Sequence, residues 1–346
     1  LKPNMSKLPE HVGIDFGNHS VKAVELKNIT SSPELINFGS QRTPHGVINS
    51  EDEVHQNQLA DAVKTLFSTA KIRTKNVVMA LPESSVFTRF IEFPGVKLEE
   101  LENAIYYQAK DYIPMNINDV HMSSVNLGFD QDKNAFRVLL VAAPIKVIDI
   151  FAKVAEKAGL NPIAIETESV AMGRSMYRAT GKKHMVMLDF GATSTDMSIL
   201  LEGQLVFSQS IAIGSDSLTQ AIVNKFNFEY QQAEEYKRNY GVVEGVLEGK
   251  MYQTLSPILS AINTEVSRGI EFYKNKTLAQ APTDVMLSGD GALLPGLPEF
   301  ISKNLNLNAT LSNPWNNIKI PDKYKNIVSK SASSFSVSIG LALKDE

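Results

Sequence analysis

Near its start the chain contains Val12-Gly13-Ile14-Asp15-Phe16-Gly17-Asn18-His19-Ser20-Val21-Lys22, two short β-prone runs on either side of a polar turn. A glycine lets the backbone approach a ligand, and consecutive N–H groups in such a turn can form an anion-binding nest. Asp15 is placed to hold a phosphate-bound Mg²⁺ through water, and Lys22 to act as a phosphate counter-charge. An ordinary hairpin with an Asx turn accounts for the same residues equally well.

The same design returns in Leu188-Asp189-Phe190-Gly191-Ala192-Thr193-Ser194-Thr195-Asp196, where a strand, an aspartate and a glycine precede a run of hydroxyls. The two loops indicate a coarse internal duplication, with two related halves and a cleft between them. Together they can clamp a polyphosphate from both sides with a cation between, so the pair is stronger evidence than either loop alone. We expect Asp196, by contrast, to pair within the sheet.

A third glycine-bearing turn follows a predicted strand, in Gly289-Asp290-Gly291-Ala292-Leu293-Leu294-Pro295-Gly296-Leu297. Pro298 permits a helix to begin close behind it. A flat ring can pack on a backbone that lacks Cβ atoms, so this turn is a candidate site for a base. A tight strand-to-helix turn explains the pattern as well, because a lone G-x-G is weak evidence.

The hydrophobic periodicity predicts an α/β protein. In the N-terminal part it predicts strands at His11–Phe16, Val21–Leu26, Glu34–Ser40 and Asn76–Leu81, and a helix at Val54–Lys71. Residues 84–166 are predicted to form a small α+β module with strands at Phe87–Phe93, Val120–Leu127, Ala135–Ala143 and Pro162–Ile165, and helices at Leu98–Tyr112 and Ile145–Ala158. The later part is predicted to hold strands at His184–Asp189, Asp196–Leu201, Gln204–Ile213 and Asp284–Ser288, and helices at Leu218–Tyr240, Leu255–Leu278 and Phe335–Leu343.

Composition narrows the classes of function. The chain has 346 residues, a formal net charge of −4 and no cysteine, so disulfides, thiolate metal sites and cysteine nucleophiles are excluded. A mildly acidic chain without a basic block is a poor candidate for binding nucleic acid or anionic lipid through its bulk charge. The longest apolar run, Val138–Ile145, is too short to cross a bilayer, and Leu1–Glu10 does not have the apolar segment of a signal peptide. We therefore expect a cytoplasmic protein that reaches a membrane only through a partner.

Three glycine-bearing turns in this order resemble the actin, sugar-kinase and chaperone-ATPase superfamily. Ile165–Gly173 and Ser336–Leu343 resemble its two connecting helices, and Ala233–Lys237 resembles a helix that touches ribose and adenine in bacterial actins. The resemblance extends from Val12 to Leu343 and implies an actin-like (ribonuclease H-like) duplicated fold that binds ATP or ADP with Mg²⁺. The nucleotide contacts that it implies are Gly17, Asn18, His19, Ser20, Lys22, Gly191, Ala192, Thr193, Ser194, Glu234, Lys237, Gly289, Asp290, Gly291 and Leu293, with Asp15 and Asp189 on the metal through water.

Relatives in this superfamily place a Gln or Glu in the first connecting helix to orient the attacking water. Glu168 matches that position best, and with Asp15 and Asp189 it forms the predicted catalytic set; Glu166 lies two residues away. Binding alone does not imply fast hydrolysis, because the water must also lie in line with the γ-phosphate. We expect at most slow turnover.

The sequence also departs from the superfamily pattern. Ala192 and Thr193 stand where many relatives have glycines, and Asp290 replaces the middle glycine of the third turn. Alanine is small and aspartate tolerates left-handed geometry, so binding is expected to be kept. An Asp290 that pointed toward the phosphates would weaken it.

The module at residues 84–166 stands where FtsA and PilM proteins carry their extra subdomain. Arg89–Pro94, Tyr106–Pro114 and Asn313-Pro314-Trp315 resemble elements of the PilM family of type IV pilus assembly. FtsA proteins end in an amphipathic helix, whereas only Lys344–Glu346 follows the last predicted helix here. The implied function is an ATP-binding scaffold, peripheral to the inner membrane, that recruits the cytoplasmic tail of a PilN-type protein. The implied groove walls are Arg89, Ile91, Phe93, Tyr107 and Tyr112.

The resemblance divides the chain into four parts. Residues 11–83, 167–182 and 326–346 form the first core subdomain, and residues 84–166 form the inserted, partner-binding one. Residues 183–215 and 283–325 form the second core subdomain, and residues 216–282 form a helical, nucleotide-contacting one.

Other functions remain open on the same residues. An FtsA-like division or cytoskeletal protein that polymerises at the membrane is one, and a small-molecule kinase of the same superfamily is another. A sugar kinase needs a catalytic base beside a second, hydroxyl-rich pocket, and no separate carboxylate group for it is evident in the sequence. A superfamily fold with a degenerate nucleotide site is a further reading. The pilus-scaffold function is compatible with self-association and with contacts to other pilus platform and motor components.

Overall fold

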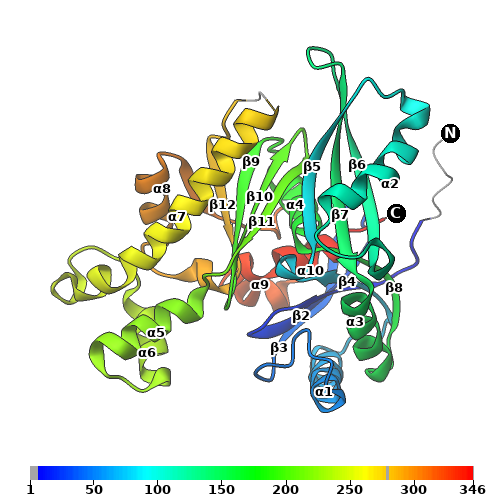
Figure 1. The fold of residues 1–346 in the computed structure, drawn as a ribbon. Helices are drawn as coiled ribbons and strands as arrows, with labels where there is room; N and C mark the ends of the chain where they lie inside the picture. Colours follow the sequence, from blue (N-terminus) through cyan, green and yellow to red (C-terminus); the bar gives the residue numbers. More distant parts are fainter. Residues whose placement is uncertain (1–6, 278–279, 346) are drawn as a thin grey trace.

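Two five-stranded sheets with the same strand arrangement form the framework of the computed structural model, which describes residues 7–277 and 280–345 (Figure 1). The first sheet has the order β3-β2-β1-β4-β8 and the second the order β11-β10-β9-β12-β13. In each, three antiparallel strands are followed by two parallel ones. The predicted duplication is therefore confirmed. The strands of the first sheet are β1 (Val12–Phe16), β2 (Ser20–Lys27), β3 (Glu34–Arg42), β4 (Asn76–Leu81) and β8 (Asn161–Thr167), and those of the second are β9 (Met185–Phe190), β10 (Thr195–Leu201), β11 (Gln204–Ile211), β12 (Asp284–Ser288) and β13 (Asn308–Leu311).

Two helices lie between the sheets, α4 (Glu168–Thr180) and α10 (Ser336–Ala342). Their apolar side chains share one buried cluster with residues of both sheets, including Met172 of α4 and Leu341 of α10. The two helices approach closely, because a Cβ at Gly340 would lie 1.8 Å from the carbonyl oxygen of Ala171. α10 also packs against β1, where a Cβ at Gly13 would lie 2.2 Å from the carbonyl oxygen of Ser338.

The outer faces of both sheets are covered by helices. α1 (Glu53–Ala70) and α3 (Ile145–Lys157) share a core with β1 and β4, and α7 (Lys250–Thr277) and α8 (Leu297–Leu305) share one with the second sheet (Figure 1). α9 (Asp322–Val328) packs beside β2 and β3. Shorter 3₁₀ turns are η1 (Glu83–Ser85), η2 (Leu98–Glu100), η3 (Ile117–Asp119), η4 (Val246–Gly249), η5 (Asp290–Leu293) and η6 (Ala332–Phe335). Within residues 7–277 and 280–345, no helix has the length and apolar character to span a membrane.

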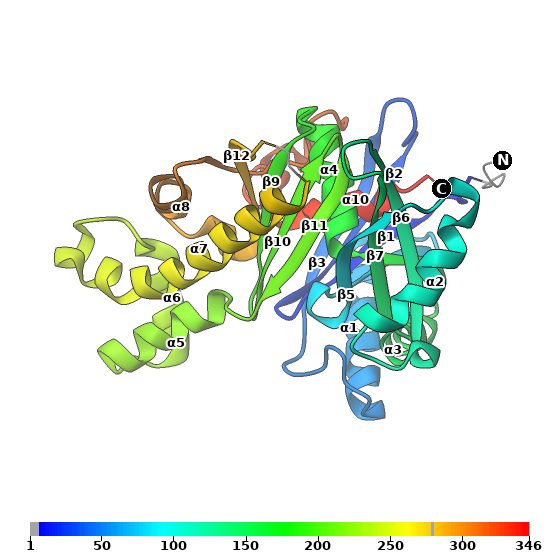
Figure 2. The ribbon, with the colours of Figure 1, turned by 45° about the horizontal axis from the view of Figure 1, so that its top comes forward.

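A third sheet of order β5-β7-β6 carries α2 (Leu101–Tyr112) on one face, and its strands are β5 (Phe87–Pro94), β6 (Val120–Asp130) and β7 (Ala135–Pro144). It lies at the opposite end of the molecule from the helices α5 (Ser215–Phe226) and α6 (Tyr230–Tyr240) (Figure 2). The predicted module 84–166 is larger than this unit. β8 pairs in parallel with β4, and α3 packs against α1 on the first sheet. This strand and this helix therefore belong to the first half and not to the third sheet.

Two helix predictions differ from the structure. The single helix predicted at Leu218–Tyr240 is broken into α5 and α6 at Asn227, which has a left-handed backbone with φ of 54°. Asparagine tolerates this conformation, and Phe228 then packs against Phe226 and Tyr236. The helix predicted at Leu255–Leu278 begins earlier, at Lys250; Leu278 lies outside the described residues. β13 was not predicted at all.

The crossing of α4 and α10 makes Gly340→Ala destabilising. Its Cβ meets backbone that cannot give way, so we expect the free energy of unfolding to fall by about 2 kcal/mol or more. Gly173→Ala is the control on α4, since its Cβ would meet flexible side-chain ends and no backbone; the nearest atom belongs to Leu200, at 3.0 Å. Denaturant unfolding measures both. Equal stability of the two variants would contradict the close crossing.

Candidate functional site

The two predicted phosphate loops meet across the boundary between the halves. Asn18 Nδ2 in the first loop donates a hydrogen bond to Thr193 Oγ1 in the second at 3.0 Å. The loops are also built alike: a Cβ at Gly17 would lie 2.8 Å from the Ser20 carbonyl oxygen, and one at Gly191 would lie 3.0 Å from the Ser194 carbonyl oxygen. The duplication therefore brings two equivalent turns to one place.

The turns are anchored from outside by hydrogen bonds to their carbonyl groups. Thr43, just past the end of β3, donates its hydroxyl to the Gly17 carbonyl oxygen at 2.7 Å. In the second loop, the N–H groups of Ser215 and Asp216 donate to the carbonyl oxygens of Gly191 and Ala192, both at 2.9 Å. The start of α5 therefore holds the second loop in position.

Several carboxylates converge at these loops. Burial raises the pKa of Asp15 to about 6, although Lys22 opposes the shift. Burial, with the charges of Asp15 and Asp196 added to it, raises the pKa of Asp189 to about 7. Burial together with Asp196 and Asp15 also raises the pKa of Glu168 well above its usual value. The cleft concentrates negative charge, which favours a bound cation or proton.

Asp196 pairs with Asp189 in the register of β9 and β10, as expected for a sheet residue, and Ser194 Oγ donates to its Oδ2 at 3.3 Å. Burial raises its pKa to about 7, with its hydrogen bond from Ser210 opposing. Its effect on Asp189 and Glu168 adds Asp196 to the cleft carboxylates, a role that the sequence pattern did not indicate.

Lys22 is buried on β2, directly opposite Asp15 in the β1–β2 register. Its Nζ forms an ion pair with Asp290 Oδ2 at 3.0 Å, and this contact joins the two halves across the cleft. Burial acts against ionisation of Asp290, but Lys22 holds its pKa below the usual value. Asp290, which departs from the superfamily pattern, therefore pairs with Lys22, the residue predicted to face a phosphate.

The described residues contain no group of three or more His, Asp or Glu side chains placed to hold a metal ion directly. Mg²⁺ commonly keeps several waters and takes one or two carboxylates plus phosphate oxygens. The donor set of Asp15 and Asp189 fits that kind of indirect binding, so the predicted metal contacts stay a prediction.

The glycines of the third turn face the protein itself. A Cβ at Gly289 would lie 2.4 Å from Asp189 Oδ1, and one at Gly291 would lie 2.1 Å from the Phe190 ring. These glycines thus allow β12 and the turn after it to sit against the second phosphate loop. Leu293, at the end of η5, is exposed.

On α6, Lys237 is buried and forms contacts with α5 and with its own helix. Its Nζ donates to Ser215 Oγ at 2.6 Å and to Thr219 Oγ1 at 2.7 Å, and pairs with Glu234 Oε2 at 2.7 Å. Burial opposes ionisation of Glu234, but Lys237 and Arg238 lower its pKa to about 2. The two residues implied to contact ribose and adenine therefore lie together, joined to the helix that anchors the second loop.

The two glutamates at the start of the connecting helix point to different partners. Glu166 forms a bidentate ion pair with Arg174, at 2.6 and 2.8 Å, and is not part of the carboxylate cluster. Glu168 is the first residue of α4, and its Oε2 accepts the N–H of Glu83 at 2.9 Å. Glu168 and not Glu166 thus lies with the cleft carboxylates, and its role toward a water stays a prediction. Glu83 itself was not singled out from the sequence.

The predicted partner groove is only partly open. Ile91 and Phe93 are buried beneath α2, in one cluster with Leu101 and Ala109, so they are core residues and not accessible walls. Arg89 lies on the same face of β5 as Ile91 and Phe93, since it is two residues before Ile91, but it is exposed. Its guanidinium lies 5.3 Å from the centre of the Tyr112 ring.

Tyr107 remains as a candidate contact on the outer side of α2, since 70% of its surface is exposed. It forms an edge-on contact with Tyr106, which is also exposed. Both rings of this pair therefore lie at the surface, and neither enters the core.

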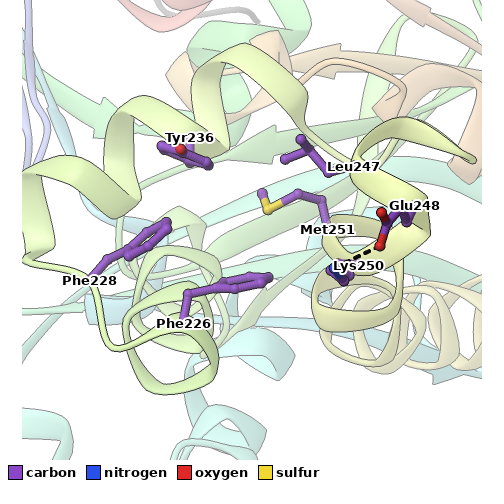
Figure 3. Close-up of a pocket in the computed structure, with 7 residues that line it drawn as sticks. All are labelled: Phe226, Phe228, Tyr236, Leu247, Glu248, Lys250 and Met251. Carbon is purple, nitrogen blue, oxygen red and sulfur yellow. Dashed lines mark ion pairs between the residues drawn. The ribbon is translucent and has the colours of Figure 1, made fainter.

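A separate apolar cavity of about 270 Å³ lies in the helical part, and Figure 3 shows its lining. Phe226, Phe228, Tyr236, Leu247 and Met251 point toward it, and an ion pair of 2.7 Å between Glu248 and Lys250 lies at its edge. None of the predicted site residues lines this cavity.

Comparisons with known proteins agree with this arrangement. The model of a family described as type IV pilus assembly protein PilM matches residues 13–346. Cell division protein FtsA of Enterococcus hirae is 23% identical over 355 aligned positions, covering 90% of this chain and 79% of that protein. A solved PilM-PilN type IV pilus biogenesis complex has a TM-score of 0.83 and 27% identity, covering 97% of this chain and 98% of that one. MreB5 of Spiroplasma citri bound to ADP has a TM-score of 0.54 and 15% identity, covering 98% and 95%.

Two equivalent sheets, helices crossing between them and paired loops at their junction define an actin-like protein, as predicted. Within that class, the chain belongs to the PilM family of type IV pilus assembly proteins. The resemblance found in the sequence is thereby confirmed.

The raised pKa of Asp189 predicts a pH-dependent effect of Asp189→Asn. Between about pH 4 and about pH 7 the folded protein keeps a proton that the unfolded chain has lost, so this carboxyl costs stability as the pH rises. The amide of the variant does not ionise, so its contribution to stability does not change with pH in this way. We therefore expect the Tm of the variant, relative to the unsubstituted protein, to be higher at about pH 8 than at about pH 5.

The measurement is thermal unfolding in chelator without nucleotide. Asp61→Asn is the control, because that carboxylate is exposed on α1. If both variants show the same pH dependence, Asp189 does not titrate as a buried group.

Proposed function

We propose that this chain is an ATP-binding actin-like scaffold of the type IV pilus inner-membrane platform. The observation that carries the proposal is the meeting of two equivalent Asp–Gly loops, with Asn18 bonded to Thr193 across the cleft. Family membership supports the pilus assignment. Nucleotide binding is supported by the similar fold of a bacterial actin that was solved with ADP.

In this proposal each half contributes part of a phosphate site. The turns at Gly17–Ser20 and Gly191–Ser194 present backbone N–H groups and hydroxyls to phosphates, and Asp15 and Asp189 hold the waters of Mg²⁺. Glu234 and Lys237 contact ribose and adenine, and the turn at Gly289–Leu293 borders the base. The Mg²⁺ bound with the nucleotide would supply positive charge beside carboxylates that are costly to ionise.

Lys22 can serve a phosphate only by leaving Asp290 or by sharing with it, because the two form an ion pair. The competition lowers nucleotide affinity by the cost of separating the pair. Hydrolysis is slow in this proposal, and Glu168 orients the attacking water. Burial and the nearby carboxylates raise the pKa of Glu168, which favours its protonated form and so works against its role as an acceptor for that water.

The first test is nucleotide binding measured by thermal shift with and without Mg²⁺. Asp15→Ala or Asp189→Ala should reduce the magnesium-dependent part of the rise in Tm. A ligand that binds the folded state stabilises it less when its affinity is lower. Asp290→Asn should increase the rise, because it frees Lys22. Unchanged shifts in both aspartate-to-alanine variants would refute the assigned phosphate site.

The second part of the proposal concerns the partner. Similarity to a solved PilM-PilN complex supports capture of the cytoplasmic tail of a PilN-type inner-membrane protein. A short extended tail can lie along a sheet edge and place alternate side chains in pockets. β5 is an edge strand of the third sheet; Arg89 lies on it in contact with Tyr112 of α2, and Tyr107 is exposed on α2. The protein would then be cytoplasmic and peripheral to the inner membrane through this tether.

Peptide binding tests this surface. A fluorescent peptide of the cognate tail should bind with micromolar affinity, since it must order on binding. Tyr107→Ala and Arg89→Ala should each weaken binding roughly tenfold, as aromatic and arginine contacts often dominate such interfaces.

Tyr230→Ala is the matched control, an exposed tyrosine on the helical part. Equal affinities of all three variants would place the peptide elsewhere. If the protein alone pelleted with anionic liposomes at physiological salt, the tether would be unnecessary and an FtsA-like function would gain support.

A further inference from the structure

Glu83 is a buried carboxylate at the place where the two halves and the third sheet meet. It is the first residue of η1, directly after β4 and Pro82, and 4% of its surface is exposed. β5 begins shortly after it and lies alongside β11 of the second half. Glu83 therefore sits on the seam between the two halves.

The carboxylate of Glu83 accepts hydrogen bonds from three different elements. Oε2 accepts Ser169 Oγ at 2.7 Å and the Ser169 N–H at 3.4 Å, at the start of α4. Oε1 accepts Ser208 Oγ from β11, and Thr88 of β5 donates a further side-chain bond. A buried carboxylate is costly unless it is hydrogen-bonded, so these donors keep Glu83 in one position.

The main chain of the same residue reaches the cleft. The N–H of Glu83 donates to Glu168 Oε2 at 2.9 Å. The side-chain anchors on Ser169 and Ser208 thus determine where this N–H lies. Ser198 Oγ donates to Ser169 Oγ at 2.7 Å and extends the network to β10.

Ser208 belongs to the second half, whereas Glu83 follows a strand of the first. Their hydrogen bond forms only while β11 lies against the start of α4. Closure of two parts around a ligand is a common way to complete a reactive site, because it sets the last group in place. Here the group set in place is the Glu168 carboxylate.

We propose that Glu83 is a positioning residue of the cleft: by fastening β11 to the start of α4, it places its own N–H against Glu168 and sets the direction of that carboxylate. The inference rests on the proposed function, in which Glu168 orients the water that attacks bound ATP. A carboxylate that serves stability alone would form the same hydrogen bonds. The two roles differ in whether substitution lowers turnover beyond its effect on stability.

The experiment compares Glu83→Ala and Ser208→Ala with a matched control, Glu25→Ala. Glu25 is also a buried carboxylate with two side-chain donors, Asn37 at 2.7 Å and Thr74 at 2.5 Å. It lies opposite Val12 on β2 and is not part of the cleft. For each variant we would measure Tm, the Kd for ATP with Mg²⁺, and the rate of phosphate release in a single turnover.

Glu83→Ala and Ser208→Ala should each lower the single-turnover rate about tenfold or more, because a small misplacement of a reacting group has effects of this size. Their Kd for ATP should stay within about threefold, as expected when an interaction made mainly in the transition state is removed. Glu83→Gln should retain most of the turnover, since its amide can accept from Ser169 and donate to Ser208 Oγ. Glu25→Ala should lower Tm and leave the turnover unchanged.

Turnover in Glu83→Ala and Ser208→Ala equal to that of Glu25→Ala would overturn the inference and leave Glu83 a structural group. If Glu83→Ala does not fold, Ser208→Ala decides, because it removes one hydroxyl only. A protein that binds ATP but never cleaves it would also overturn the inference, while the nucleotide site would stand. A protein that binds no nucleotide would overturn the proposed function itself, and the inference with it.

Discussion

The close crossing of α4 and α10 sets the geometry on which the cleft depends. Gly340 allows the backbones of the two helices to touch at Ala171, and Gly13 allows β1 to pack directly on α10. Both sheets contribute side chains to the core around this crossing. Because tightly packed interiors deform little, the distance between the two halves is determined here. The phosphate loops can then meet without a covalent link between them.

That distance brings like charges together. Asp15 and Asp196 raise the pKa values of Asp189 and Glu168, on top of the effect of burial. A ligand that supplies positive charge stabilises the ionised carboxylates of such a site. When no such ligand is bound, the site favours the protonated carboxyls. The ion pair between Lys22 and Asp290 provides some compensation, and it links the halves at the same time. In the proposed function, affinity for a phosphate and the contact between the halves would therefore be coupled through one lysine.

The third sheet lies against the second half of the molecule as well as the first. Its strand β5 lies beside β11, and Lys133, in the turn between β6 and β7, donates to the carbonyl oxygen of Lys276 near the end of α7 at 3.2 Å. The sheet thus touches both halves, although it is inserted into the first. β5 begins four residues after Glu83, so a partner bound to β5 would lie close in sequence to the residue that bonds the two halves together. Partner binding and nucleotide binding would then both act on the segment that contains Glu83 and β5.

The sequence alone determined the repeated strand–Asp–Gly design, because a close backbone approach and a strand-end carboxylate need particular residue types at a particular spacing. The duplicated α/β fold and the choice of Glu168 followed from those motifs and from family resemblance. Local patterns could not show that Ile91 and Phe93 lie beneath α2, since an alternating strand reads the same whichever face is covered. They could not show that β8 joins the first sheet, or that Asp290 reaches Lys22, because both contacts join distant segments. Glu83 carries no motif at all: its importance comes from three hydrogen-bond donors on separate elements, and only the tertiary structure brings those donors to one carboxylate.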